Sequence, residues 1–278
     1  MRSPCLCPRP ETEELVEHAA ADIRRILRSM DLIDKADLMS SGESNPDSRR
    51  KIRVLDIGCG TGAIGLALAS EFPGRLQVVA IDILDEAINL SRENASILLP
   101  PREEYVALRA SAANFGLGVK KKGVDVAQNV YNYGVDIDTD NDIDISKSID
   151  MFDIVVSNPP YIPADEIPHL TQDVLAYEDL GALCGGLDGM DIVKDIVRGL
   201  ARWWRNDRDK GGDNLGIKPL PAPTCLMEVD PTHPDLLRSW IDEEEEIKEF
   251  VELDNIKRDM QGNLRFITLR QRSTKSDS

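Results

Sequence analysis

The turn Asn158-Pro159-Pro160-Tyr161 holds the residue types of this sequence that are best suited to chemistry. It follows a β-branched run, residues 154–156, which is typical of a buried strand. Neither proline can donate a backbone hydrogen bond, and each fixes φ at about −65°, so the turn is stiff and its carbonyl oxygens are free to accept. The turn therefore presents acceptors between an amide side chain and an aromatic ring.

Such a turn can hold a planar NH2 group, as found in a carboxamide or on a nucleic acid base. The lone pair of this nitrogen is delocalised, so it is a poor nucleophile that gains most from being positioned. The side-chain oxygen of Asn158 and the carbonyl of Pro159 can accept its two N–H bonds, while Tyr161 packs against its plane. We therefore predict Asn158, Pro159 and Tyr161 as catalytic residues, and these three with Pro160 as the substrate site. A turn that only ends a strand is the alternative that these residues alone leave open.

A glycine-rich loop, residues 58–62, follows an earlier apolar run at residues 53–57. A second apolar run, residues 77–81, ends in Asp82, which lies 20 residues beyond Gly62. Glycines at a strand-to-helix turn let the backbone approach a ligand, and a carboxylate at this spacing is typical of one that binds ribose hydroxyls. The unit therefore predicts a site for a nucleoside cofactor.

The neighbouring residues favour S-adenosyl-L-methionine as this cofactor, although residues 58–63 also match the pattern G-x-G-x-x-A of a nicotinamide dinucleotide site. Asp56 can bind an amino group, which a methionine moiety has and a pyrophosphate lacks. The turn at 158–161 also follows a later strand, where a methyl acceptor would be held. The residues that we predict to bind the cofactor are Asp56, Gly58, Cys59, Gly60, Thr61, Gly62, Asp82 and Asn158.

Composition and charge limit the classes of protein that fit. A chain of 278 residues with 41% hydrophobic and 30% charged residues is ordinary for a soluble globular protein of one large domain with additions. No run approaches the ~20 apolar residues that span a bilayer, so no membrane partner is expected. The net charge of −17 argues against non-specific binding of nucleic acid phosphates. The cysteines lack metal-ligand spacing, which predicts no metal site and a reducing compartment; they are Cys5, Cys7, Cys59, Cys184 and Cys225.

The order of apolar runs along the chain predicts an α/β domain. Residues 11–30 have helical periodicity, and residues 34–50 are polar with Gly42 and Pro46, which indicates a linker. The last two strands have a connection too short for a crossover helix and should be antiparallel. Together the runs predict a three-layer, Rossmann-like α/β fold with a seven-stranded, mostly parallel sheet and an antiparallel C-terminal strand. Strands are predicted at 53–57, 77–81, 105–109, 153–156, 224–229, 250–253 and 264–269, and further helices at 63–71, 84–98, 189–204 and 236–241.

Two segments interrupt this alternation. Residues 116–150 carry alternating aspartates but lack the glycine and glutamate positions of a calcium-binding EF-hand loop, so we predict a disordered acidic insertion. Residues 162–187 have no periodicity, which predicts an irregular loop that closes the site at the carboxyl edge of the sheet. The predicted units are an N-terminal helix and linker, a catalytic domain and a tail, at 1–50, 51–272 and 273–278.

Six segments spread over most of the chain carry a family resemblance. They are PRPETEELVEHA at 8–19, VLDIGCGTGAIGLALA at 54–69, AIDI at 80–83, FDIVVSNPPYIP at 152–163, DVLAYEDLGALCGGLDGMDI at 173–192, and the D-x-x-G-x-x-R pattern of Asp259, Gly262 and Arg265. Together they resemble the HemK-like protein-(glutamine-N5) methyltransferases, which modify translation release factors. The NPPY turn is shared with methyltransferases of adenine and cytosine amino groups in nucleic acids, whereas PRPETE and the segment around Gly185-Gly186 are more specific to the glutamine branch.

The resemblance implies a class I methyltransferase fold, with S-adenosyl-L-methionine against residues 58–62 and its ribose on Asp82. It also implies that residues 158–161 hold the glutamine of a Gly-Gly-Gln loop in a release factor, which would be the protein partner. No direct nucleic acid partner is expected, and a monomer is. The resemblance is to the bacterial and mitochondrial branch, which favours a mitochondrial location with the cytoplasm as the alternative.

The sequence departs from this family at three places, of which the least is Asp179, where a proline usually follows Tyr-Glu. Members usually carry a helical docking domain before PRPETE, and here seven residues precede that motif. An acidic residue usually contacts adenine after the third strand, but this slot reads Ala110-Ser111-Ala112-Ala113, so Ser111 or Asn114 is expected to substitute, with Ser111 as the predicted cofactor ligand. Two alternatives therefore stand beside the release factor enzyme: a nucleic acid amino-methyltransferase, and a catalytically impaired binding protein with a methyltransferase fold.

Overall fold

Seven strands form one sheet in the order β3-β2-β1-β4-β5-β7-β6 within the residues that the computed structural model describes, which are 8–41, 50–101, 104–116, 152–204 and 220–272. Strands β1 to β5 pair in parallel, and β7 runs antiparallel between β5 and β6. The predicted mostly parallel sheet with an antiparallel C-terminal strand is thus confirmed. The strands are β1 (Ile52–Ile57), β2 (Leu76–Asp82), β3 (Glu104–Arg109), β4 (Ile154–Ser157), β5 (Thr224–Glu228), β6 (Val251–Arg258) and β7 (Leu264–Gln271).

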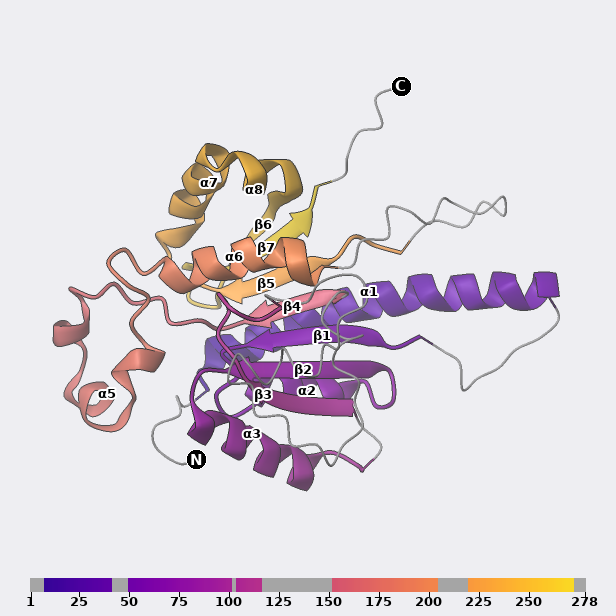
Figure 1. Ribbon diagram of the computed structural model, residues 1–278, viewed down its shortest axis with the longest axis horizontal. Coiled ribbons are helices and arrows are strands. Elements are labelled where there is room, and N and C mark those ends of the chain that lie inside the picture. Colours follow the sequence, from indigo (N-terminus) through magenta and orange to yellow (C-terminus); the bar gives the residue numbers. More distant parts are fainter. Residues whose placement is uncertain (1–7, 42–49, 102–103, 117–151, 205–219, 273–278) are drawn as a thin grey trace.

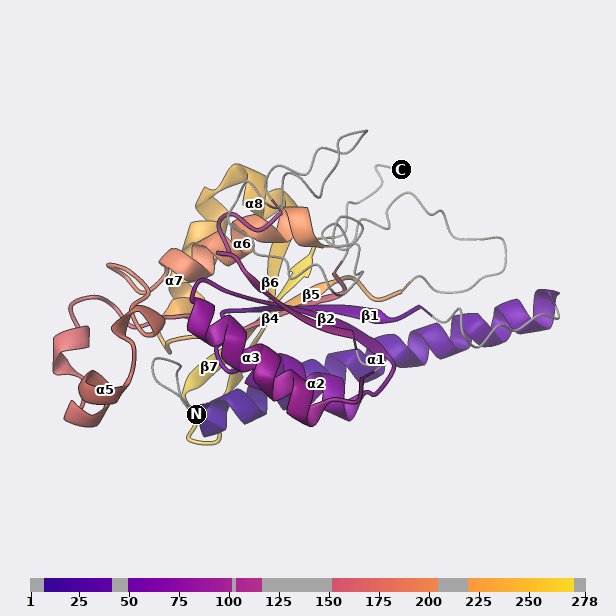
Figure 2. The ribbon, with the colours of Figure 1, turned by 60° about the horizontal axis from the view of Figure 1, so that its bottom comes forward.

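Helices cover both faces of this sheet, which makes the three predicted layers (Figures 1 and 2). One face carries α1 (Pro10–Ser41), α2 (Ala63–Glu71) and α3 (Asp85–Leu98), and the other carries α6 (Asp191–Trp203), α7 (His233–Glu243) and α8 (Glu245–Phe250). No helix in the described part of the chain is long and apolar enough to cross a membrane.

Successive residues of the central strands pack into opposite layers. Val54 belongs to a core with Leu15 of α1 and Leu68 of α2, whereas Leu55 belongs to a core with Val193 of α6. All five of these side chains are fully buried. Burial on both faces explains why the parallel strands read as continuous apolar runs rather than alternating ones.

Helix α1 is longer than the sequence pattern predicts. The predicted linker at 34–50 is wrong for residues 34–41, which continue the helix to Ser41. The segment is polar, but it contains no glycine or proline before Gly42, so nothing in its local chemistry stops the helix. The first half of α1 packs under the sheet, and the second half projects beyond it (Figure 1).

The segment between β4 and α6 is also more regular than predicted. The prediction of an irregular loop at 162–187 is wrong for three short helical turns, η3 (Ile167–His169), α5 (Gln172–Tyr177) and η4 (Leu180–Ala182). The base of the segment is closed because the N–H of Ile162 donates to Leu183 at 2.9 Å and the N–H of Gly185 donates to Ile162 at 2.9 Å. Helix α5 thereby stands off the carboxyl edge of the sheet (Figure 1). The predicted acidic insertion and the tail lie outside the described residues, apart from Gly116.

Candidate active site

The carboxyl ends of three parallel strands meet at one edge of the sheet. In the strand register, Ile57 of β1 pairs with Ile81 of β2 on one side and with Ser157 of β4 on the other. The glycine loop, Asp82 and the NPPY turn follow directly after these strands. Parallel pairing therefore brings together three segments that are far apart in sequence.

The glycine loop turns sharply because Gly58, Gly60 and Gly62 all adopt positive φ, at 67°, 52° and 81°. Its first N–H groups, from Gly58 and Cys59, both donate to the carbonyl of Ile81, at 2.8 and 3.0 Å. These conformations are open to glycine and strained for other residues. The loop is thus held close to the end of β2.

Asp82 is fixed by this loop. Its Oδ2 accepts the N–H of Gly60 at 2.9 Å, and its Oδ1 accepts the N–H of Leu84 at 3.0 Å. Burial raises the pKa of Asp82, although these backbone hydrogen bonds work in the opposite direction. Each oxygen keeps acceptor capacity that a ligand hydroxyl could use.

These segments surround a cavity of about 170 Å³. Five of the predicted cofactor residues line it, and the slot at 110–113 does so as well. Two carboxylates that were not predicted, Asp179 and Asp195, also line it. Asp195 lies on α6, a helix that the sequence identified only by its apolar stripe. The lining suits a nucleoside, because it combines carboxylates with apolar side chains. The predicted residues that line the cavity are Gly58, Gly60, Asp82, Ser111, Asn158, Pro159 and Pro160.

Other predicted cofactor residues shape the loop from beneath and are not among those that line the cavity: Asp56, Cys59, Thr61 and Gly62. Asp56 is fully buried, and its Oδ2 accepts the N–H of Gly65 at 2.9 Å in the first turn of α2. It therefore supplies the acceptor that the N-cap residue of this helix, Gly62, cannot provide. The carbonyl of Thr61 accepts the Nδ2–H of Asn94 at 2.9 Å, which ties the loop to α3.

A second cavity, of about 220 Å³, lies on the other side of the NPPY turn. Four residues line both cavities, Asn158, Pro159 and Pro160 of the turn and Ala182 of η4, so the turn forms most of the wall between them. Tyr161 lines the second cavity alone. The other lining residues of the second cavity are mostly apolar, with one arginine: Arg9, Ile162, Leu170, Val174, Ala182 and Leu183.

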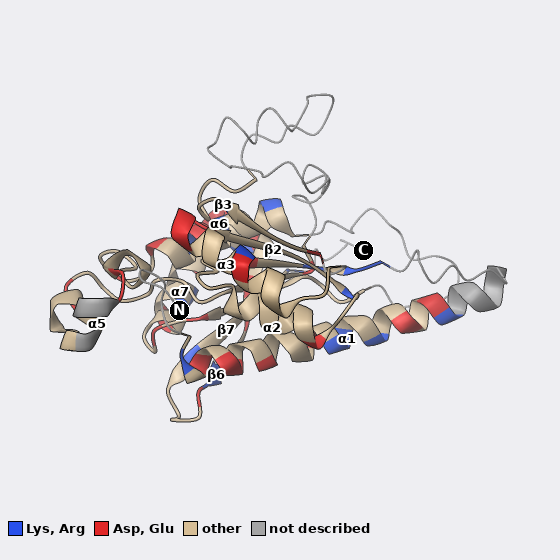
Figure 3. Cartoon of the chain, turned by 90° about the horizontal axis from the view of Figure 1, so that it is seen from below, with Lys and Arg blue, Asp and Glu red and all other residues tan. Residues whose placement is uncertain are grey.

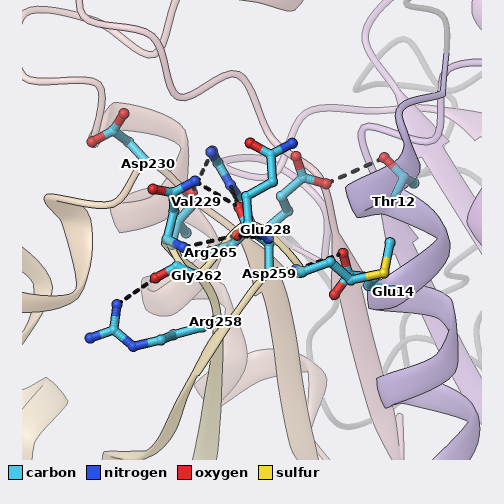
Figure 4. Close-up of polar contacts among 12 residues, drawn as sticks. Thr12, Glu14, Glu228, Val229, Asp230, Arg258, Asp259, Gly262 and Arg265 are labelled. Atoms are coloured by element: carbon cyan, nitrogen blue, oxygen red, sulfur yellow. Dashed lines mark hydrogen bonds and ion pairs between the residues drawn. The ribbon is translucent and has the colours of Figure 1, made fainter.

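Two residues that sequence reasoning missed hold the NPPY turn from behind. The hydroxyl of Thr12 donates to Glu228 at 3.3 Å (Figure 4). The Nδ2–H of Asn158 in turn donates to Thr12 Oγ1 at 3.1 Å. The hydroxyl of Tyr161 donates to the other oxygen of Glu228 at 3.2 Å. The signals in the sequence were a threonine within PRPETE and an acid at the end of the apolar run 224–228.

The D-x-x-G-x-x-R pattern positions an arginine against this network (Figure 4). Asp259 accepts the backbone N–H groups of Gln261 and Asn263, both at 2.9 Å, which closes the turn between β6 and β7. It also accepts Nε–H of Arg265 at 3.4 Å. The guanidinium of Arg265 lies over the ring of Tyr161, at 5.9 Å from the ring centre, where a cation is attracted to the aromatic face.

Comparison with known proteins matches residues 48–126 to a family model described as a methyltransferase domain. The human MTRF1L release factor glutamine methyltransferase is 29% identical over 98% of this chain and 62% of its own length. The release factor glutamine methyltransferases of Koribacter versatilis and Clostridium acetobutylicum are 28% and 32% identical over 84% and 69% of this chain, and over 60% and 48% of their own lengths.

Over most of its length, the chain is similar in sequence to release factor glutamine methyltransferases. The predicted family resemblance is thereby confirmed, and the methyltransferase domain implies a cofactor of the S-adenosylmethionine type. The chain spans between about half and two thirds of the length of these release factor glutamine methyltransferases.

Proposed function

We propose that this protein is an S-adenosyl-L-methionine-dependent methyltransferase that modifies N5 of the glutamine in the Gly-Gly-Gln motif of a peptide chain release factor. The names of its relatives support this substrate. The observation that carries the proposal is the shared wall: Asn158, Pro159 and Pro160 separate a cavity with nucleoside-binding features from a mostly apolar one. A methyl group that passes beside these residues would go directly from the cofactor to the acceptor.

The first cavity would hold the cofactor, which when bound supplies an electrophilic methyl group on a sulfonium. The backbone at Gly58 and Gly60 would lie against it, and Asp82 would bind the ribose hydroxyls. Ser111 and Asp195 both line this cavity, and we propose that they supply the polar contacts to the base. Asp56, Cys59, Thr61 and Gly62 would set the shape of the loop rather than line the cavity.

The second cavity would admit the glutamine side chain. Asn158 Oδ1 and the carbonyl of Pro159 would accept its two N–H bonds, which turns the nitrogen toward the wall, while Tyr161 and Pro160 bound its plane. Positioning of this kind, with water excluded, lowers the barrier without a strong base in the site. The residue that the proposal depends on most is Asn158.

The substitution Asn158→Ala tests the mechanism. It removes a side-chain acceptor from the glutamine amide, so the rate of methyl transfer should fall about 100-fold or more. The measurement is label transfer from labelled S-adenosyl-L-methionine to a purified release factor, with a copy whose Gly-Gly-Gln glutamine is changed to alanine as the negative substrate. Asn255→Ala, an exposed position on β6, is the matched control.

Binding of S-adenosylhomocysteine by calorimetry accompanies this assay. Full activity of Asn158→Ala would contradict the mechanism. Label on an oligonucleotide and none on the release factor would replace the substrate with a nucleic acid. If the wild-type protein does not bind S-adenosylhomocysteine, a binding protein without catalysis would be favoured.

The remaining parts of the proposal concern the whole protein. We propose a monomer that acts in the mitochondrion, with the cytoplasm as the alternative, and a catalytic domain at 51–272 preceded by the helix and linker of 1–50. Size-exclusion chromatography with light scattering tests the oligomeric state, and a stable dimer would contradict the monomer. Cell fractionation tests the location, and a purely cytoplasmic protein would contradict the mitochondrial one.

A further inference from the structure

Glu228 is a buried carboxylate that touches neither cavity. It is 1% exposed and is absent from the residues that line the cofactor cavity and the substrate cavity. Its two oxygens are each engaged, Oε2 by the hydroxyl of Thr12 and Oε1 by the hydroxyl of Tyr161. Both partners belong to the surroundings of the NPPY turn, so Glu228 can act on the site only through them.

The direction of these hydrogen bonds follows from the donors available. An ionised carboxylate only accepts, so Thr12 and Tyr161 must both donate to Glu228. The single hydroxyl proton of Thr12 is then used, and Thr12 Oγ1 can only accept from its other neighbour, Asn158. The amide of Asn158 must therefore present its NH2 group to Thr12, as observed at 3.1 Å, and keep its oxygen for the opposite side.

We propose that Glu228 is a positioning residue that, through Thr12, holds the Asn158 amide with its oxygen toward the substrate glutamine, and that holds Tyr161 in place at the same time. This inference rests on the proposed function. A flipped Asn158 amide would present two N–H donors to the N–H donors of the glutamine, and the acceptor pair would be lost. Three segments from distant parts of the chain meet here: the first turn of α1, the NPPY turn and the end of β5.

The charged and titratable groups around Glu228 support an ionised state at neutral pH. Burial raises the pKa of Glu228 to about 6, while the hydrogen bond from Tyr161 and the positive charge of Arg265 oppose that rise and Glu11 adds to it. Below this pKa the carboxyl group carries a proton and becomes a donor itself. The order of the hydrogen bonds is then no longer imposed on Thr12.

The first test is Glu228→Gln, which keeps the shape and removes the charge. A glutamine can donate to Thr12, which frees the Thr12 hydroxyl to donate to Asn158 and lets the amide flip. The expected result is a fall in kcat of about tenfold or more, with KM for the release factor and the dissociation constant of S-adenosylhomocysteine each within about twofold of the wild type. Glu243→Gln, exposed on α7, is the matched control.

The second test separates positioning from mere support of the fold. The kcat of the wild type should fall as pH drops through about 6, and Glu228→Gln should lose this step. Thr12→Val should lower kcat as Glu228→Gln does, whereas Thr12→Ser should restore it because serine keeps the hydroxyl. Equal kcat in the wild type, Glu228→Gln and Thr12→Val would overturn the inference.

A third measurement does not depend on activity. The side-chain NH2 resonances of Asn158 in the ¹⁵N-labelled protein should titrate with a midpoint near pH 6 in the wild type and not in Glu228→Gln. Identical, pH-independent resonances in both proteins would overturn the inference. A wild type that titrates in this way but methylates no release factor would instead contradict the proposed function.

Discussion

Asp56 combines full burial with a carboxylate oxygen, Oδ1, that has no hydrogen-bond partner among the described residues. Burial raises the pKa of this group from 3.8 to about 7, although the N–H of Gly65 opposes the rise. The folded protein therefore keeps a proton that the unfolded chain releases between about pH 4 and pH 7. Stability falls as pH rises through this window, because the unfolded state is the one favoured by ionisation.

The substitution Asp56→Asn should remove this cost and keep an acceptor for Gly65. At pH 8 the cofactor-free variant should exceed the wild type in free energy of unfolding, by an amount that the pKa difference limits to about 4 kcal/mol. At pH 4 the two proteins should converge. Urea unfolding at the two pH values makes the measurement, and a gap of equal size at both would count against the explanation.

Gly62 is required by two constraints at once. It has φ of 81°, and a Cβ atom there would lie 2.7 Å from both Ser91 Oγ and Tyr105 OH, which are hydrogen-bonded to each other. Gly74 shares the first constraint, with φ of 70°, but a Cβ atom there meets nothing within 4 Å. The pair therefore separates backbone strain from steric overlap.

Gly62→Ala should destabilise the protein by about 1–3 kcal/mol more than Gly74→Ala, since only the first adds overpacking to the left-handed backbone cost. It should also weaken binding of S-adenosylhomocysteine, because the glycine loop must shift away from Ser91 and Tyr105 to relieve the overlap. Chemical denaturation and calorimetry on both variants test this. Equal losses of stability would show that the contacts give way easily.

Short-range patterns predicted the residues that line the cavities better than those that support them. The NPPY turn and Asp82 follow directly after apolar runs, so spacing alone identified them. Thr12 and Glu228 are 216 residues apart, and nothing local marks either as a partner of the other. Their role depends on strand order and helix packing, which exist only after folding.

At the scale of elements, one ion pair joins the start of α1 to the end of α5. Arg9 precedes α1, and its guanidinium contacts Glu178, the C-cap residue of α5, at 2.5 Å. The Glu178 side chain is 13% exposed, so this contact is more sheltered than an ordinary surface pair. Because Arg9 also lines the second cavity, the pair links α5 to the wall of that cavity.

Arg9→Ala should loosen α5 without changing the cofactor cavity. Hydrogen exchange of the Gln172–Tyr177 amides should accelerate, and KM for the release factor should rise several-fold while affinity for S-adenosylhomocysteine holds. Arg24→Ala serves as the control, because it breaks an exposed ion pair between Arg24, further along α1, and Glu71 of α2. Unchanged exchange in α5 would show that its own packing, not Arg9, holds it.

Element types were more predictable than element lengths. The apolar stripe of α1 was read correctly, since Leu15, Ile23 and Ile26 are at most 1% exposed. The end of that helix was placed too early because polar residues were taken as a break, although residues 34–41 contain no glycine or proline. The turns at 167–182 have too few residues to show helical periodicity, so the sequence carried no signal for them.

At the scale of the molecule, acidic and basic side chains are interleaved along α1 (Figure 3). Together with the net charge of −17, this pattern gives the helix no uniformly positive face of the kind that nucleic acid phosphates attract. The α/β class and parallel sheet followed from the alternation of apolar runs. The position of β7 between β5 and β6 did not follow from that alternation, because chain order alone does not determine where the last strands join a sheet.

The interior position of β7 bears on how the protein is made. Strand β5 emerges from the ribosome well before its neighbour β7, so one edge of its backbone stays unpaired through the synthesis of the next 35 residues, 229–263. Arg265, which lies over Tyr161, arrives with that late strand. A nascent chain that ends before β7 therefore lacks the arginine over Tyr161, and it exposes an unpaired edge of β5 of the kind that seeds aggregation.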